Sequence, residues 1–443
     1  MMDRRELIAG TSAALGLAAL PRLAQAATSR FPAGFLWGAS TAGHQIEGNN
    51  THSDYWVLEH VEPRAFATPS GDAANSLHLW PADLDLARDL GLNCYRFSLE
   101  WSRIEPEEGH FSNAMLDYYA RIIDGCVERG LLPVVTFNHF TAPRWFTMAG
   151  NWANPASPDM FARYCERTAR RLAGKIGYAV TLNEPNLPAF LHWVNLPAPI
   201  IAVRRANREA AARSLGVERF DAGFSLDREA YAPMVANLQR AHRMGRAAIK
   251  SVRPGLPVGM ALAVADEQAV VANSHSRVKR AEVYEPWFEA GQDDDYVGVQ
   301  NYTRIRMDQN GVMRPPEGAP MSSAHLEIYP PSLANAVRQV YTAVGKKILI
   351  TEHGVASPDD RARVEFIKAA LPSLAEVISG GVPVLGYIHW SLIDNYEWYS
   401  GFGQQLGLAQ VDPVTFARTP KLSGLLLGQI ARANALPARI SPL

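Results

Sequence analysis

The chain has 443 residues, of which 47% are hydrophobic and 20% are charged, and its formal net charge is −1. This balance lacks the basic excess typical of a nucleic-acid-binding protein, so we expect no nucleic-acid partner. The length suits two or three average domains, but a single α/β barrel also reaches it.

The first 26 residues differ from the rest of the chain. Arg4-Arg5 precede an apolar run from Leu7 to Leu20, and the small-residue site Ala24-Gln25-Ala26 follows. This order is typical of a secretory signal peptide, because the apolar run is too short to span a bilayer. The paired arginines resemble a twin-arginine export signal. We therefore predict that residues 1–26 are cleaved and that residues 27–443 form a periplasmic or secreted domain without a stable membrane anchor.

From Phe35 onward, helical and strand patterns alternate. Residues 113–130 predict a helix with an apolar face that includes Val127 and with Gly130 at its end, and an apolar strand follows. Residues 157–174 repeat this helical pattern before another apolar strand. Strands that are apolar almost throughout are typical of parallel sheets covered by helices. The three cysteines lie inside these patterns, so we expect them to pack as small apolar side chains: Cys94, Cys126 and Cys165.

Eight such strands predict one (β/α)8 TIM barrel, of the α/β class, with elaborated rim loops. The expected strands are Phe35–Ser40, Cys94–Trp101, Pro133–Phe140, Tyr178–Pro185, Pro257–Val264, Tyr296–Thr303, Lys347–Gly354 and Leu385–Asp394. Three long segments are only partly periodic, and we expect them to form rim loops and short helices: 187–230, 265–295 and 304–346.

Six of the eight strands end on polar or aromatic residues, and the clearest example is "KILITEHG", where an apolar run stops on Glu352. In this barrel the active site is built from the C-terminal ends of the strands. We therefore expect Glu352 to point into a shared cleft at the mouth of the barrel.

A second carboxylate, Glu184 in "TLNEPN", ends the fourth strand, while Glu352 ends the seventh. We expect the two to face each other across the barrel mouth. Facing carboxylates with aromatic walls suit glycoside cleavage, in which an acid protonates the leaving oxygen while positive charge develops on the sugar. The alternative is that "NEP" is only a turn and Glu352 only a solvated strand end.

Five separated motifs together resemble glycoside hydrolase family 1, the retaining β-glucosidase-like enzymes. They are "FLWGASTAGHQIEG", "YRFSLEWSRIEPEEG", "TLNEPN", "ITEHG" and "HWSLIDNYEW", in the family's order. A lone "NEP" also fits other barrel glycosidases, whereas "QIEG" and "DNYEW" favour family 1.

The resemblance implies that Glu184 is the general acid/base and Glu352 the nucleophile, about 5 Å apart. It places Arg96 and Tyr302 beside the nucleophile. We expect Arg96 to lower the pKa of Glu352, while burial and a neighbouring anion raise the pKa of Glu184.

The resemblance also implies a set of sugar-binding residues. Gln45, His139, Asn183 and Glu397 match positions that hydrogen-bond sugar hydroxyls, and Trp390 and Trp398 match the stacking floor. A pyranose has apolar faces and a polar rim, so such a mixture suits it. A carboxylate at Glu397 argues against a phosphorylated sugar, because it would repel phosphate.

Several residues depart from the usual family pattern: His353 replaces Asn after the nucleophile, Phe140 replaces Trp, Gln300-Asn301-Tyr302 stands where Asn-Tyr-Tyr is common, and Leu406 replaces an aromatic residue. The segment after "NEPN" also differs. These changes leave both carboxylates in place, but they bear on sugar preference and on the aglycone. We hypothesise that His353 perturbs the pKa of Glu352 and thereby shifts the pH at which the protein is active.

The sequence therefore favours an exported retaining β-glycosidase acting on an unphosphorylated β-glycoside or oligosaccharide, with β-glucosides first. Two alternatives remain: a transglycosidase using the same covalent intermediate, and a catalytically weak sugar-binding protein. We expect no cofactor and no metal, because His52, Asp54, His60 and His78 are scattered and no phosphate-binding glycine loop is present. Oligomeric state has no signature in the sequence.

Overall fold

The computed structural model describes residues 30–194, 196–224 and 226–436. The predicted signal peptide lies outside the described residues. Within them, no helix combines the length and apolar character that a membrane crossing requires.

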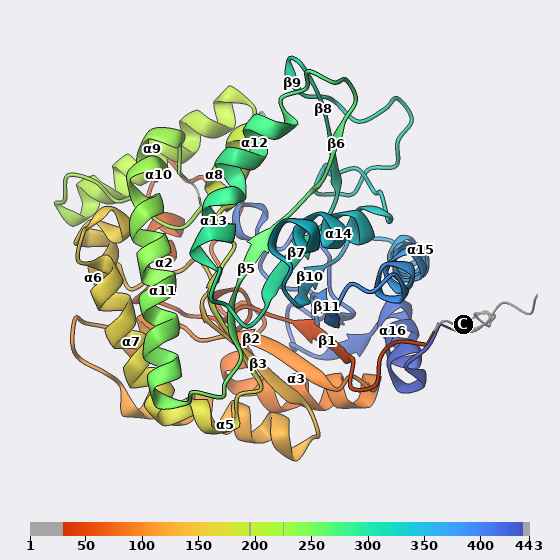
Figure 1. The fold of residues 1–443 in the computed structure, drawn as a ribbon. Helices are drawn as coiled ribbons and strands as arrows, with labels where there is room; N and C mark the ends of the chain where they lie inside the picture. The colour runs from red at the N-terminus through yellow and green to blue at the C-terminus, as the bar shows by residue number, and fades with distance from the viewer. Residues whose placement is uncertain (1–29, 195, 225, 437–443) are drawn as a thin grey trace, which may run out of the picture.

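Eight parallel strands close into a barrel, which confirms the predicted TIM-barrel fold (Figure 1). Around the barrel the order is β1-β11-β10-β7-β5-β4-β3-β2. All eight expected strands are present: β1 Leu36–Ser40, β2 Cys94–Ser98, β3 Leu132–Asn138, β4 Tyr178–Asn183, β5 Val258–Ala263, β7 Val297–Asn301, β10 Ile348–His353 and β11 Val384–Trp390. The second strand is shorter than predicted, because a helical turn begins at Trp101.

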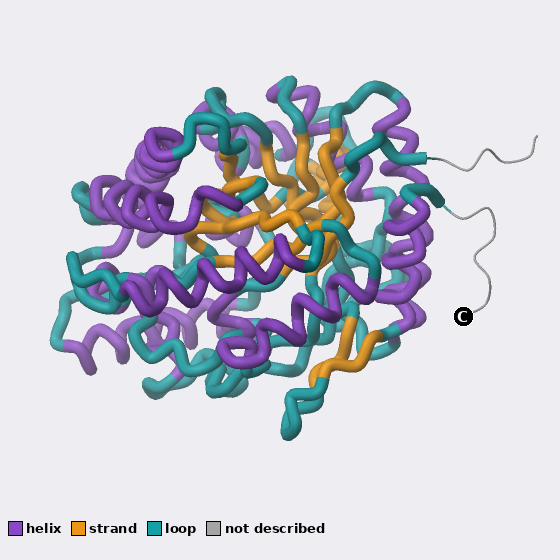
Figure 2. The backbone as a smooth tube through the Cα atoms, turned by 90° about the horizontal axis from the view of Figure 1, so that it is seen from below, coloured by secondary structure: helices purple, strands orange, loops and turns teal. Residues whose placement is uncertain are grey.

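Helices surround the barrel, and Figure 2 shows the strands gathered in the middle of them. The helices that follow or precede barrel strands are α3 Ser76–Leu90, α5 Asn113–Glu128, α7 Ser157–Leu172, α11 Val235–Val252, α13 Glu285–Ala290, α14 Ser332–Val344, α15 Asp360–Ser379 and α16 Leu422–Ala433. Their apolar faces pack on the outer face of the strands and form the main hydrophobic core. A separate small cluster fills the barrel interior, and Val134, Val180 and Leu349 belong to it.

Local sequence explains where two of these helices lie. The Ser112 hydroxyl caps α5 by accepting from the Met115 amide, and Gly130 after it has a positive φ of 70°. Most of the predicted face of α5 is buried, but Met115 is half-buried and Val127, at the edge of that face, is 47% exposed. Gly245 on α11 lets α7 approach closely, since a Cβ there would lie 2.8 Å from a ring carbon of Phe161.

The three cysteines are buried and unbonded, as expected of core residues.

The long segments form more regular structure than predicted. On the rim lie α1 Gly43–Ile46, α2 Asp54–Glu59, α4 Trp101–Ile104, α6 Arg144–Met148, α8 Leu187–Trp193, α9 Ala198–Leu215, α10 Arg228–Tyr231 and α12 Ser276–Val283. Helix α9 has 18 residues and is not short. A small sheet, β6 Asp266–Ala269, β8 Arg304–Asp308 and β9 Gly311–Val312, rises above the mouth (Figure 1), and β12 Ala409–Val411 pairs with β13 Arg418–Pro420. The prediction of rim loops and short helices for 265–295 and 304–346 missed the sheet of β6, β8 and β9.

Candidate active site

The turn after β4 directs Glu184 towards the barrel mouth. Glu184 has a positive φ of 44°, which is uncommon for a residue with a side chain. Its amide donates to the carbonyl of Ala261, and the Asn186 side chain forms two hydrogen bonds with the backbone of Ala263 on β5. The Tyr231 hydroxyl donates to the carbonyl of Pro185 at 2.8 Å. The backbone of "NEPN" is therefore fixed on both sides of the turn.

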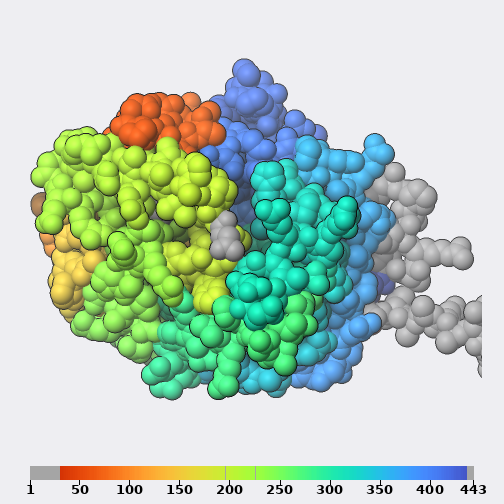
Figure 3. Space-filling view, turned by 90° about the horizontal axis from the view of Figure 1, so that it is seen from above, coloured from red at the N-terminus to blue at the C-terminus, as the bar shows by residue number. Residues whose placement is uncertain are grey.

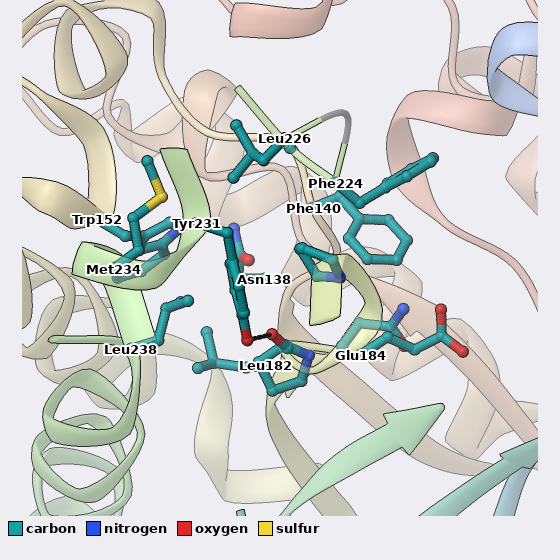
Figure 4. Close-up of a pocket in the computed structure, with 14 residues that line it drawn as sticks. Asn138, Phe140, Trp152, Leu182, Glu184, Phe224, Leu226, Tyr231, Met234 and Leu238 are labelled. Atoms are coloured by element: carbon teal, nitrogen blue, oxygen red, sulfur yellow. Dashed lines mark hydrogen bonds between the residues drawn. The ribbon is translucent and has the colours of Figure 1, made fainter. Parts of the chain in front are cut away.

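A small cavity lies behind this turn, with a volume of about 30 Å³ and walls that include Leu182, Met234 and Leu238 (Figure 4). In Figure 4 the carboxyl group of Glu184 points away from these apolar residues. The surroundings of the Glu184 backbone are thus largely apolar, and the carboxyl group itself is directed towards the barrel mouth.

Glu352 ends β10 and is only 4% exposed, so it is not the solvated strand end of the alternative interpretation. One carboxylate oxygen, Oε1, accepts from Arg96 Nη1 at 2.6 Å and from Gln300 Nε2 at 2.9 Å. The other, Oε2, accepts from the Tyr302 hydroxyl at 2.7 Å. Three donors from β2 and from the end of β7 therefore converge on one carboxylate.

The two carboxyl groups differ in their electrostatics. Burial raises the pKa of Glu184 well above its usual value, and the negative charge of Glu352 raises it further, against a smaller effect of Arg96. Burial also raises the pKa of Glu352, although the Arg96 charge and three hydrogen bonds oppose it. Arg96 acts in the predicted direction, but burial is larger, so the expected lowering of the Glu352 pKa is wrong. The donors around Glu352 stabilise its ionised form, so a single shared proton belongs on Glu184.

Strands β4 and β10 are separated by β5 and β7 on the shorter path around the barrel. They are therefore three strand positions apart, whereas diametrically opposite strands of an eight-stranded barrel are four positions apart. Their ends are still close enough for Glu352 to act on Glu184 electrostatically.

Asn183 joins the two sides of the site. Its Oδ1 accepts from Arg96 Nη2 at 2.5 Å and from Gln300 Nε2 at 2.7 Å. Its Nδ2 lies 3.3 Å from Nε2 of His139 and donates to it. Burial and the charge of Arg96 lower the pKa of His139 well below its usual value, so this ring is neutral.

The other predicted sugar-binding residues form one cluster beside the carboxylates. The Gln45 Nε2 donates to the Tyr396 carbonyl at 2.8 Å and to Glu397 Oε2 at 3.4 Å, and Trp390 Nε1 donates to Glu397 Oε1 at 3.1 Å. The ring of His139 lies 5.7 Å from that of Trp390, with an angle of 24° between their planes. The structure thus brings together every residue that the sequence placed in the site.

Two buried polar atoms in this cluster have no hydrogen-bond partner in the described part of the chain: Gln45 Oε1 and His139 Nδ1. Buried polar atoms are nearly always satisfied, so these two are available to a ligand. Burial raises the pKa of Glu397 to about 8, and its hydrogen bond from Trp390 opposes this. Glu397 is therefore largely protonated at neutral pH, and charge repulsion alone is a weaker argument against phosphate than the sequence suggested.

Sequence reasoning missed the roles of two residues. Gln300 was noted only as a departure, yet it donates to both Glu352 and Asn183. The ring of His44 lies parallel to that of Trp398, with centroids 5.7 Å apart, and its Nε2 contacts Glu59 at 2.8 Å. Gln300 lies near the C-terminal end of β7 and His44 lies just after β1, and this position at the barrel mouth is the signal that could have singled them out.

The departures from the expected pattern lie around the site. Phe140 contacts Trp398 edge-on at 5.6 Å, and Leu406 packs in a cluster with Trp390. His353 projects to the outer face of β10, where its ring stacks on Phe366 at 4.6 Å. Burial lowers the pKa of His353 to about 3, so it is neutral and does not touch Glu352. The hypothesis that His353 perturbs Glu352 therefore finds no support in the contacts.

The described residues contain no group of three or more His, Cys, Asp or Glu side chains with the geometry of a metal site.

Comparisons with known proteins agree with this geometry. The sequence profile of glycosyl hydrolase family 1 matches residues 27–200 and 259–436. A β-glucosidase from Agrobacterium sp. is 28% identical, with 89% of this chain and 94% of that protein covered. The solved structure of β-glucosidase 1317 is 40% identical, with a TM-score of 0.87 and coverage of 90% of this chain and 98% of that one. The structure of β-glycosidase BGL167 is 41% identical, with a TM-score of 0.86 and coverage of 93% and 100%.

Proposed function

Because this chain belongs to glycosyl hydrolase family 1, we propose that it is a retaining β-glycosidase that hydrolyses unphosphorylated β-glycosides, with β-glucosides as its first substrates. The observation that carries the proposal is the unequal pair of buried carboxyl groups. Glu352 receives hydrogen bonds from Arg96, Gln300 and Tyr302, whereas burial and the charge of Glu352 hold the proton on Glu184.

In the first step, the Glu352 carboxylate attacks the anomeric carbon while Glu184 transfers its proton to the glycosidic oxygen. The bond between the sugar and the leaving group breaks, and a sugar ester of Glu352 forms. Glu352 thereby loses its negative charge, which removes one cause of the raised pKa of Glu184. Glu184 can then ionise.

In the second step, ionised Glu184 takes a proton from water, and the water oxygen attacks the anomeric carbon. The ester bond to Glu352 breaks and both carboxyl groups return to their starting states. Two inversions give a product with the β configuration of the substrate. If an alcohol or a second sugar replaces water, the same intermediate yields transglycosylation.

The glycone is assigned to the cluster around Trp390, Glu397 and Trp398. The unpartnered Gln45 Oε1 and His139 Nδ1 provide an acceptor and a donor for sugar hydroxyl groups. The indole planes suit the apolar face of a pyranose. Glu397 contributes a buried carboxyl group and not a positive charge to this cluster, which supports an uncharged sugar. The names of the β-glucosidase relatives support glucose.

Initial rates on aryl β-glycosides test this function, with unphosphorylated glucoside, galactoside, fucoside, mannoside and xyloside compared. We expect the glucoside to be cleaved fastest, the first sugar product to have the β configuration by NMR, and Glu352→Gln to be inactive. An α product would contradict retention, and a folded wild-type protein that cleaves none of the five would favour a sugar-binding role. Added acceptor alcohol and product analysis separate hydrolysis from transglycosylation.

We propose also that residues 1–26 direct export, on the evidence of the sequence alone. Replacing both Arg4 and Arg5 with Lys should retain the protein inside the cell as an uncleaved precursor, as cell fractionation and intact mass would detect. Normal export of that variant would contradict a twin-arginine signal.

A further inference from the structure

A small sheet rises above the barrel mouth between the two strands that carry the candidate catalytic carboxyl groups. β5 ends at Ala263 and β6 begins at Asp266, while β7 ends at Asn301 and β8 begins at Arg304. β5 and β7 are the two strands between β4 and β10, so β6 and β8 continue them beyond the mouth (Figure 1). This sheet therefore stands at the barrel mouth, on the side between the strand ends that carry Glu184 and Glu352.

A groove of about 440 Å³ separates this sheet from α8 and from residues 325–327, and we call it the rim groove. Its apolar wall includes Phe190, Val194 and Val312. In the view from above, teal residues of the small sheet and yellow residues near α8 border a hollow on this surface (Figure 3). Thr303, which lines the rim groove, directly follows Tyr302 in the chain, and the Tyr302 hydroxyl donates to Glu352.

Three arginines line the rim groove, and one of them is neutralised. Arg304 donates to both carboxylate oxygens of Glu327, at 3.0 and 2.6 Å, and lies 3.9 Å above the ring of Tyr329. Arg306 and Arg314 also line the groove, and neither has an acidic partner among the described residues. The rim groove thus pairs an apolar wall with two unneutralised guanidinium groups.

We infer that the rim groove binds the aglycone and selects aglycones with an apolar body and a terminal carboxylate. The inference rests on the proposed function and adds the class of leaving group. Four residues of extended chain separate Tyr302 from Arg306, about 13 Å, so an aromatic ring with a short carboxylate arm spans the distance. Guanidinium groups recognise carboxylates by paired N–H donors, and an aromatic or aliphatic body fits beside Phe190.

The test uses two substrates that differ only in charge: the β-glucoside of 4-hydroxycinnamic acid and the β-glucoside of its methyl ester. The measured quantity is the ratio of kcat/KM for the acid to kcat/KM for the ester. Comparing this ratio between proteins cancels the difference in leaving-group reactivity. The variants are Arg306→Gln and Arg314→Gln, and the control is Arg361→Gln, which removes a positive charge from an exposed side chain at the start of α15.

We expect each rim-groove variant to lower the acid-to-ester ratio about three- to tenfold, through KM, and Arg361→Gln to leave it unchanged. Raising the ionic strength should lower the wild-type ratio and have less effect on the ratios of the variants. If both substrates are cleaved and the ratio is the same in all four proteins, the inference is wrong while the proposed function stands. If neither substrate nor 4-nitrophenyl β-glucoside is cleaved, the proposed function fails and the inference fails with it.

Discussion

Removing the Tyr302 hydroxyl isolates one contribution to the state of Glu352. Its oxygen donates to Glu352 Oε2 at 2.7 Å, and no other hydrogen bond to Oε2 is seen among the described residues. Burial raises the pKa of Tyr302 well above its usual value, so the hydroxyl keeps its proton and acts as the donor. Tyr302→Phe therefore leaves Oε2 without a partner, while Arg96 and Gln300 still bind Oε1.

The expected magnitude follows from the strength of a hydrogen bond to a charged group, about 1.5–3 kcal/mol, which corresponds to about 1–2 pKa units. The hydroxyl stabilises the ionised form, so its loss raises the pKa of Glu352. The acidic limb of kcat/KM against pH should move up by about 1–2 units, and activity below that limb should fall about tenfold per pH unit.

The assay is a pH profile of kcat/KM with an aryl β-glucoside. Tyr387→Phe is the control, because Tyr387 is also a tyrosine inside the protein, but its hydroxyl contacts His353 at 2.9 Å on the outer face of the barrel and not Glu352. We expect its acidic limb to match that of the wild type. An acidic limb that stays in place in Tyr302→Phe would refute the assignment of Glu352 as the group titrating there.

Three further changes test neighbouring parts of the structure. Gln300→Leu removes a neutral donor that both Glu352 and Asn183 accept from. We therefore expect kcat/KM in the same assay to fall about tenfold. A value equal to that of the wild type would contradict the proposed support of the nucleophile by Gln300. His353→Asn should lower the free energy of unfolding by about 1–3 kcal/mol. It should not move the acidic limb of kcat/KM against pH, because the His353 ring is neutral and faces outward. A moved limb would support the hypothesis that His353 perturbs Glu352. Burial raises the pKa of Asp54 from 3.8 to about 6, so folding favours the protonated carboxyl group. This contribution to the free energy of unfolding is fully present below pH 3.8 and is lost as the pH rises through 6. Asp54→Asn should therefore gain about 3 kcal/mol in unfolding free energy relative to wild type between pH 4 and pH 7, as denaturant titrations would measure, and an equal pH dependence of both proteins would oppose this.

The sequence predicted the barrel because its strands are apolar almost throughout and alternate with amphipathic helices. The helix at residues 157–172 is a clear case, since Phe161, Tyr164 and Cys165 recur at helical spacing and all are buried. The rim was predicted less well. β8 has the pattern Arg-Ile-Arg-Met-Asp, and such a short alternation at the surface does not differ from a loop until it pairs with β6.

The candidate site could be predicted residue by residue where motifs specify position, as at Glu184 and Glu352. The contribution of Gln300 depends on which strands are neighbours, because its amide reaches Asn183 on β4 and Glu352 on β10 from the intervening β7. The direction of the pKa shift of Glu352 could not be predicted, because it depends on whether the effect of burial or the effect of the Arg96 charge is larger. His353 was misjudged because adjacent residues of a strand point to opposite faces, so sequence proximity to Glu352 gave no contact.

In the proposed mechanism, Glu352 forms the covalent bond to the sugar. The most direct test is to incubate the protein with 2-deoxy-2-fluoro-β-glucosyl fluoride, whose fluorine at carbon 2 slows breakdown of the sugar ester, and to locate the label by mass spectrometry of peptides. We predict time-dependent loss of activity and one fluoroglucosyl group attached to Glu352. A label on Glu184 or on any other residue, or inactivation without a sugar adduct, would contradict the account.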